Sequence, residues 1–236
     1  LLPQCSRPNV TYGFDETNDY VISNYEPSEF RSHFLLTYSG QSIQIDLNML
    51  GRHNALNASA ACVLAIEEGI DTSIIQVALK NFMGISRRMQ VVGNMNIKNC
   101  NLILIDDYGH HPSEIKNTID SIRESHPKKK LTMVFQPHRY SRTKDLFEEF
   151  VEVLQLVDQL ILLDVYPAGE DSIKNYESKD LLKKLKDTTL NVCLSEESKV
   201  NIAIEESLED QEGIILMQGA GNISKISESL MKAYGN

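Results

Sequence analysis

The sequence predicts an α/β fold: a Rossmann-like, parallel-sheet domain over residues 88–236, preceded over residues 1–87 by part of a second α/β domain. The first observation is that short apolar runs alternate with amphipathic stretches from residue 102 onward. The runs lack the polar alternation of a half-exposed strand, as expected for strands that are buried on both faces. Strands that alternate with helices in this way form a parallel sheet with helices on both sides.

Five apolar runs are the predicted strands of this domain, and helical patterns lie between them. The strands are 102–105, 131–135, 159–165, 190–194 and 213–217. Pro112-Ser113-Glu114 opens the first helix, with proline near the first position and a carboxylate in the first turn. Thr143 is the predicted N-cap of the second helix, which has a wide apolar stripe over 146–157. Later helical stripes cover 181–185, 200–208 and 223–230.

The second observation is that the first 87 residues follow a different pattern. Two apolar runs, 34–38 and 43–47, flank Ser39-Gly40-Gln41 and predict a β-hairpin. An alanine-rich helix over 55–68 follows, and another, capped by Asp71 or Thr72, runs to about residue 82. These few strands and helices are too few for an independent domain. We therefore expect residues 1–87 to be the rear of a larger domain. A first residue that is Leu rather than Met also favours a fragment.

Charge and cysteine content argue against several classes of protein. The chain of 236 residues has a formal net charge of -10 and no basic stripe, which disfavours a nucleic-acid partner because phosphate binding relies on clustered Lys and Arg. No apolar run has the length of a membrane span. The four cysteines are scattered without a Cys-x-x-Cys pair. This distribution indicates neither a disulfide framework nor a zinc cluster, and it favours a reducing cytoplasm.

Polar, ionisable and glycine residues crowd the positions that follow four of the predicted strands. The four turns are 106–112, 136–142, 166–170 and 218–222. Ligands of an open parallel sheet bind beyond the carboxyl ends of its strands. Four such turns together therefore predict a binding or catalytic site at that edge.

His138, Arg139 and Arg142 bring an imidazole and two guanidinium groups to one of these strand ends. Guanidinium forks match carboxylates and phosphates, so the three residues predict an anionic ligand. The competing interpretation is that the arginines are surface groups paired to a helix carboxylate such as Glu148. The turn Gly219-Ala220-Gly221-Asn222 is a weak signal, because many α/β proteins need such glycines for geometry alone. The phosphate loop Gly-x-x-x-x-Gly-Lys-Ser/Thr does not occur in this sequence.

His110 and His111 could ligate a metal ion together with Asp106 and Asp107. Catalytic zinc usually takes three protein ligands, and adjacent residues at a strand end point in different directions, so hydrogen-bonding histidines are the simpler interpretation. With His138, the same four residues define an alternative function, a metal-dependent hydrolase. A non-catalytic binding module with purely structural glycine turns is a third alternative.

Asn54 and Asn57 lie three residues apart at a helix start, directly after Gly51-Arg52-His53. Asparagine amides can recognise an adenine edge because they supply both a donor and an acceptor. Simple helix capping is the alternative. Ser86-Arg87-Arg88-Met89 falls at the expected junction of the two domains, where arginines could equally belong to a linker.

In this order along the chain, the motifs resemble those of the Mur ligase family of peptidoglycan synthesis. The motifs that carry the resemblance are 51–58, 86–89, 106–112, 135–143, 165–170 and 219–222. The resemblance covers nearly the whole chain. It implies that residues 1–87 are the rear of a central ATPase domain and residues 88–236 a complete C-terminal domain. A UDP-sugar domain and the front of the central domain, with the phosphate loop and an acidic magnesium ligand, would precede them.

The resemblance further implies a cytoplasmic ligase that uses ATP and Mg²⁺ to join L-alanine to UDP-N-acetylmuramate through an acyl-phosphate. A related ligase that recycles murein peptides is the alternative within the family, and this chain alone would be inactive. The implied site residues are His53 for magnesium; Asn54 and Asn57 for adenine; Arg88 and Asp107 for the nucleotide; Tyr108 and His110 for the reaction cleft; and His138, Arg139 and Arg142 for the amino acid and nearby anionic groups.

Overall fold

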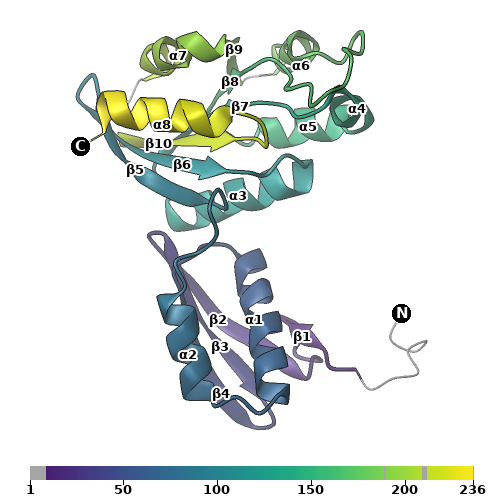
Figure 1. Cartoon of the computed structure of the whole chain (residues 1–236), viewed down its shortest axis with the longest axis vertical. Coiled ribbons are helices and arrows are strands. Elements are labelled where there is room, and N and C mark those ends of the chain that lie inside the picture. Colours follow the sequence, from purple (N-terminus) through teal and green to yellow (C-terminus); the bar gives the residue numbers. More distant parts are fainter. Residues whose placement is uncertain (1–8, 189, 209–211, 236) are drawn as a thin grey trace. The chain divides into compact units, whose positions relative to one another are not determined.

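The computed structural model describes residues 9–188, 190–208 and 212–235. The chain forms two compact units, which divide between Gly84 and Ile85 (Figure 1). Each unit is described separately below. Within the described ranges, no helix combines the length and the apolar character that crossing a membrane requires.

The first unit is a four-stranded sheet covered by two helices (Figure 1). The strands, in their order in the sheet, are β1 (Tyr12–Gly13), β2 (Tyr20–Ser28), β3 (Arg31–Tyr38) and β4 (Gln41–Leu47). The hairpin predicted from the sequence is confirmed as β3 and β4, which are antiparallel. Its turn residues Ser39 and Gly40 have positive φ angles of 46° and 74°, as a two-residue hairpin turn needs. The sequence analysis did not predict β1 and β2.

The helices of this unit are α1 (Arg52–Glu67) and α2 (Thr72–Asn81). The N-cap of α2 is Asp71, whose Oδ1 accepts a hydrogen bond of 2.8 Å from the Ser73 amide. Strand and helix side chains share one apolar core, made of Tyr20, Ile22, Phe34, Leu36, Ile45, Leu47, Ala55, Ala58, Cys62, Val63 and Ile75. The alanines on α1 allow the helix to lie close to the sheet.

The second unit contains a six-stranded, mostly parallel sheet, which confirms the predicted fold class. The strands, in their order in the sheet, are β5 (Gln90–Ile97), β6 (Cys100–Asp107), β10 (Glu212–Gln218), β7 (Lys130–Phe135), β8 (Gln159–Leu162) and β9 (Asn191–Leu194). All five predicted strands are present and parallel. The sixth, β5, is antiparallel to β6 and was not predicted. Its only buried side chains are Met95 and Ile97, so it lacks the apolar run of the other strands.

Helices cover both faces of this sheet (Figure 1). Along one face, α3 (Pro112–Ser125) contacts α5 (Phe147–Leu154), which contacts α6 (Ser178–Leu185). On the opposite face, α7 (Val200–Ser207) and α8 (Ile223–Tyr234) pack on the sheet over one apolar core. The first helix begins as predicted, with Pro112 in its first turn and a capping box between His111 and Glu114.

The prediction that Thr143 caps the second helix of this unit is wrong. Thr143 is buried inside α4 (Tyr140–Asp145), and its hydroxyl donates a 2.9 Å hydrogen bond back to the Arg139 carbonyl. Arg139 is the N-cap instead, with a φ of 74°. A second break at Leu146, with a φ of -120°, separates α4 from α5. The apolar stripe that suggested one helix therefore begins after a short helix that carries polar residues.

Candidate functional site

The strand order brings the predicted turns to one edge of the sheet. Since β10 lies between β6 and β7, Gln218 is in register with Asp107 on one side and with Phe135 on the other. The turn after β7 meets the turn after β8 through a parallel bridge between His138 and Tyr166. The carboxyl ends of β6, β10, β7 and β8 therefore build one continuous site.

Four ring side chains form a continuous series across this edge. Tyr108 and His110 make an edge-on contact with ring centroids 5.4 Å apart. The His110 and His138 centroids are 5.7 Å apart, and the His138 ring stacks on Tyr166 at 5.4 Å and 10°. The structure thus joins residues that follow three different strands, and it brings together the predicted site residues Tyr108, His110 and His138.

The two arginines that follow β7 have different environments. Nη1 of Arg142 donates a 2.9 Å hydrogen bond to the His138 carbonyl and lies 3.2 Å from His138 Nδ1, so this guanidinium is fixed beside the imidazole. The Arg139 side chain is 51% exposed and lies 3.8 Å from Glu170. Glu148, the alternative partner considered from sequence, pairs with Lys184. The Arg139 and Arg142 side chains therefore keep donors for a ligand at the strand end.

Glu170 organises the start of α4. Its carboxylate accepts hydrogen bonds from the Ser141 amide at 2.9 Å and the Ser141 hydroxyl at 2.7 Å. These bonds are the main reason that the pKa of Glu170 lies below its usual value, with Arg139 adding to the effect. The turn after β8 therefore holds the first turn of α4, and with it the backbone of Arg139.

His138 lies among positive groups that disfavour protonation of its imidazole. Burial lowers its pKa, and the charges of Arg142, His110 and Arg139 lower it further, while Glu170 acts in the opposite direction. A neutral ring beside two guanidinium groups can accept a hydrogen bond at neutral pH. This combination suits a ligand that carries both an anionic group and a hydrogen-bond donor.

We expect the Arg142→Met variant to raise the pKa of His138, because the variant removes the largest charge effect on that ring. In the parent, a folded pKa below the unfolded value of about 6.5 means that stability decreases as the pH falls from that value towards the folded pKa. An NMR titration of the His138 ring protons measures the midpoint. Arg123→Met is the control, since Arg123 pairs with Asp158 away from this edge. An unchanged midpoint in Arg142→Met would contradict the electrostatic account.

The Asp107 carboxylate forms its hydrogen bonds within the fold. It is 4% exposed, and its oxygens accept hydrogen bonds from the Met89 amide at 2.7 Å, the Gly109 amide at 2.8 Å and Gln218 Nε2 at 2.7 Å. Three donors leave little capacity for a direct ligand contact. Asp107 therefore fixes the turns that surround the site.

Asp106 is also buried, and it accepts hydrogen bonds from Arg87 Nε and the Ser227 hydroxyl, both at 3.2 Å. Burial raises its pKa, while the Arg87 charge opposes the rise.

The two adjacent histidines have different tasks. His111 is the N-cap of α3, and its Nδ1 accepts from the Ser113 amide. His110 faces the ring series, and its Nδ1 lies 3.0 Å from the Tyr108 carbonyl oxygen. In the described part of the chain, no three His, Cys, Asp or Glu side chains are grouped so that they could hold a metal ion. Asp106, Asp107 and His111 form their hydrogen bonds within the fold.

Arg88 lies beside the same edge. Its guanidinium is 3.4 Å from Glu114 and its Cζ lies 5.7 Å from the Tyr108 ring centroid. The side chain is 44% exposed, so it can reach a ligand. The sequence analysis did not distinguish Arg88 from Arg87 by chemistry, and Arg87 turns out to be the one bound within the fold.

Two buried amides, Gln136 and Gln218, had no role assigned from sequence. Gln218 Nε2 donates to Asp107 and, at 2.7 Å, to the Gly109 carbonyl. Gln136 Nε2 donates to Asn222 at 2.8 Å. A Cβ atom on Gly219 would lie 2.7 Å from the Gln136 carbonyl oxygen, so this glycine is required by close approach. The glycine turn was a visible signal, but nothing in the sequence showed which side chain would pack on it.

The predicted site residues of the first unit lie at the start of α1. Asn54 is buried, and its Nδ2 donates a 2.7 Å hydrogen bond to the Leu50 carbonyl. Asn57, one turn later, is exposed, and His53 is partly exposed. The two asparagines therefore have different surroundings, and Asn57 is the one whose amide faces solvent.

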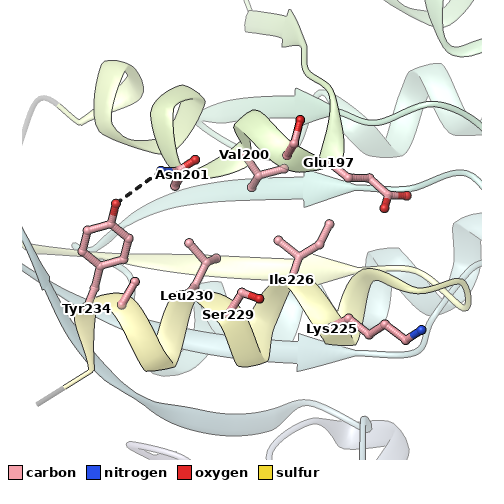
Figure 2. A pocket seen from close by; sticks show the side chains of 10 residues that line it. Glu197, Val200, Asn201, Lys225, Ile226, Ser229, Leu230 and Tyr234 are labelled. Atoms are coloured by element: carbon pink, nitrogen blue, oxygen red, sulfur yellow. Dashed lines mark hydrogen bonds between the residues drawn. The ribbon is translucent and has the colours of Figure 1, made fainter.

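A groove of about 450 Å³ lies between α7 and α8 (Figure 2). Its apolar part is formed by Val200, Ile226 and Leu230, with Tyr234 and Asn201 towards one end and Glu197 and Lys225 towards the other. None of the residues predicted for the site lines it. At the border of the groove, Glu197 accepts hydrogen bonds from Gln136 and Asn222, which belong to the strand-end turns.

Comparison with known proteins defines the class of protein. The model of the Mur ligase glutamate ligase domain matches residues 87–221, and the model of the Mur ligase middle domain matches residues 3–65. The chain belongs to the Mur ligase family.

Solved structures of this family have the same fold. A UDP-N-acetylmuramate–alanine ligase from Thermotoga maritima is 26% identical with a TM-score of 0.77, over 95% of this chain and 47% of that one. A MurF ligase from the same organism in complex with ADP is 14% identical, with a TM-score of 0.65, over 94% and 48%. A murein peptide ligase from Psychrobacter arcticus is 19% identical, with a TM-score of 0.60, over 96% and 46%. This chain thus spans about half the length of each.

Proposed function

We propose that this chain is part of an ATP-dependent ligase that joins L-alanine to UDP-N-acetylmuramate in peptidoglycan synthesis. The observation that carries the proposal is the cluster of Tyr108, His110, His138, Arg139 and Arg142 at one edge of the sheet. These residues match the motifs of the resemblance one by one. The similarity to an alanine-adding ligase at 26% identity supports the choice of amino acid.

In this proposal, Arg139 and Arg142 bind the carboxylate of alanine, and His138 lies beside them. Guanidinium groups bind both oxygens of a carboxylate and so orient the amine that must attack. Arg142 is already fixed by His138, which reduces the ordering needed when alanine binds. Tyr108 and His110 line the neighbouring part of the cleft.

Arg88 and the turn held by Asp107 would serve the nucleotide. Arg88 is exposed enough for direct contact, whereas buried Asp107 would act by fixing the backbone around Met89 and Gly109. In the first unit, Asn57 offers a free amide to adenine, and Asn54 would support it from a buried position. We assign residues 1–87 to the rear of the central domain and residues 88–236 to the C-terminal domain.

His53 is proposed as a contributor to magnesium binding, but the described side chains do not make a magnesium site by themselves. Magnesium usually keeps several waters and binds through few protein ligands together with substrate phosphates. ATP would transfer its γ-phosphoryl group to the muramate carboxylate, which gives an acyl-phosphate and ADP. The amine of alanine would then attack the acyl carbon, which forms the amide and releases inorganic phosphate. Cys62, Cys100 and Cys193 are free thiols, which suits a cytoplasmic enzyme.

The test is a phosphate-release assay on this chain and on a chain extended at its N-terminus to the length of its relatives. We expect no ATP turnover by the 236-residue chain, and turnover by the extended chain only when UDP-N-acetylmuramate and L-alanine are both present. Turnover with a murein peptide in place of alanine would identify the recycling ligase instead. Nucleotide binding without turnover of any of these substrates would favour a binding module.

A further inference from the structure

The turn Ser86–Met89 is bound tightly to two of the strand-end turns, and Arg87 makes most of the contacts. Its Nε donates to Asp106 Oδ1 at 3.2 Å, and its Nη2 donates to the Gly219 carbonyl at 2.6 Å. Its side chain is 21% exposed and that of Asp106 only 5%. One guanidinium therefore connects the end of β6 with the glycine turn that follows β10.

The backbone of this turn is bound as well. The Arg87 carbonyl accepts a 2.7 Å hydrogen bond from the Tyr108 amide, and its own amide donates to Gln90 at 2.9 Å. Arg87 and Met89 have φ angles of 57° and 47°, which lie in the left-handed region that residues other than glycine rarely adopt. Such a conformation persists where the surroundings over-determine it, as these contacts do.

The same arginine contacts the ring that borders the site. Arg87 Cζ lies 4.9 Å from the Tyr108 ring centroid, and Arg88 Cζ lies 5.7 Å from the same centroid. Arg87 points into the fold, so Arg88, the next residue, presents its partly exposed guanidinium beside Tyr108 and Glu114. The direction of the Arg88 side chain therefore depends on the contacts that hold Arg87 in place.

We propose that Arg87 is a positioning residue, which holds Tyr108, the Gly219 turn and the backbone of Arg88 in one arrangement for nucleotide binding. The role in nucleotide binding rests on the proposed function, whereas the positioning of the turn does not. The charged groups around Arg87 are Asp106, Asp107 and Arg88. A lysine could neutralise Asp106, but it could not also reach the Gly219 carbonyl in the same plane, because only guanidinium has donors in a rigid fork.

The experiment compares Arg87→Lys and Arg87→Gly with Arg123→Met. Glycine removes the side chain but suits the positive φ at this position. Arg123 is a matched control, since it also bridges a carboxylate, Asp158, and backbone carbonyls, but those of Lys129 and Leu156. Amide hydrogen exchange of Tyr108 and Met89 in the 236-residue chain measures how firmly the turn is held. The apparent KM for ATP in the extended chain measures whether nucleotide binding depends on that turn.

In both Arg87 variants, we expect the amide hydrogens of Tyr108 and Met89 to exchange at least about 10-fold faster than in the parent. The KM for ATP should rise about 10-fold, and the KM for alanine should change less. Low, non-denaturing guanidinium should partly restore Arg87→Gly. Arg123→Met should change neither readout. Faster exchange with an unchanged KM would overturn the positioning role in catalysis, and unchanged exchange would overturn the role altogether. An extended parent without ligase activity would reject the proposed function, while the exchange data would still decide whether Arg87 holds the turn.

Discussion

Replacing Arg139 or Arg142 by Lys in the extended enzyme should lower kcat/KM for alanine by about 10- to 150-fold, which corresponds to a charge-assisted interaction of about 1.5–3 kcal/mol. Lysine keeps the positive charge but loses the second donor that orients a carboxylate. Arg142 should show the larger effect, because its Nη1 also binds the His138 carbonyl. Titration of alanine at saturating ATP and UDP-N-acetylmuramate measures the change.

Arg123→Lys is the control for this prediction, since it makes the same chemical change at an arginine bound to Asp158. In Arg139→Lys and Arg142→Lys, the KM for ATP should change far less than kcat/KM for alanine, and Arg123→Lys should change neither. Exposed ion pairs contribute only about 0–1 kcal/mol, so a surface role predicts a small effect. If both Arg139→Lys and Arg142→Lys kept kcat/KM for alanine within about threefold of the parent, these arginines would not bind the amino acid.

Asp107→Asn should destabilise the second unit by about 2–4 kcal/mol, although the two side chains have nearly the same shape. The carboxylate accepts three hydrogen bonds, one on Oδ2 from Met89 and two on Oδ1 from Gly109 and Gln218. An amide has one acceptor oxygen, so its NH₂ group must face at least one of these donors. A buried donor left without an acceptor costs about 1–3 kcal/mol, and bonds to a charged group are worth about 1.5–3 kcal/mol.

Native-state hydrogen exchange of the amides in β6 and β10 measures this loss in the second unit alone. Asp120→Asn is a suitable control, because Asp120 pairs with Lys116 on the surface of α3 and is 55% exposed. That change should cost less than about 1 kcal/mol. Equal effects of the two substitutions would show that the Asp107 hydrogen bonds contribute nothing beyond a surface pair.

The sheet of the second unit was predictable because its strands are buried on both faces and therefore appear as apolar runs. The strand at 131–135 and the one at 213–217 are examples, since nearly every side chain in β7 and β10 is buried. The edge strand β5 gave no such signal, because only alternate residues near its end are buried. The division of the second helix was also not predictable, since it depends on the backbone of Arg139 and Leu146.

The turns that form the site were predictable from the sequence, but the contacts between their side chains were not. The rule that ligands bind beyond strand ends selected Tyr108, His110 and His138, which the structure brings into contact. It could not distinguish side chains that face a ligand from those that hold the turns. Asp107 was predicted to contact the nucleotide, and the structure shows its carboxylate bound within the fold. Only the sheet register, which pairs Gln218 with Asp107, reveals this difference.

The central place of β10 in the sheet has a consequence for synthesis on the ribosome. The strand that lies between β6 and β7 is made after the other five strands of this sheet. Until residues 212–218 emerge, β5–β6 and β7–β8–β9 have no strand to join them, and each exposes an apolar edge that can pair with another chain. A nascent chain that stops before Glu212 would therefore be prone to aggregation, and the second unit would complete its sheet only after residues 212–218 have been made.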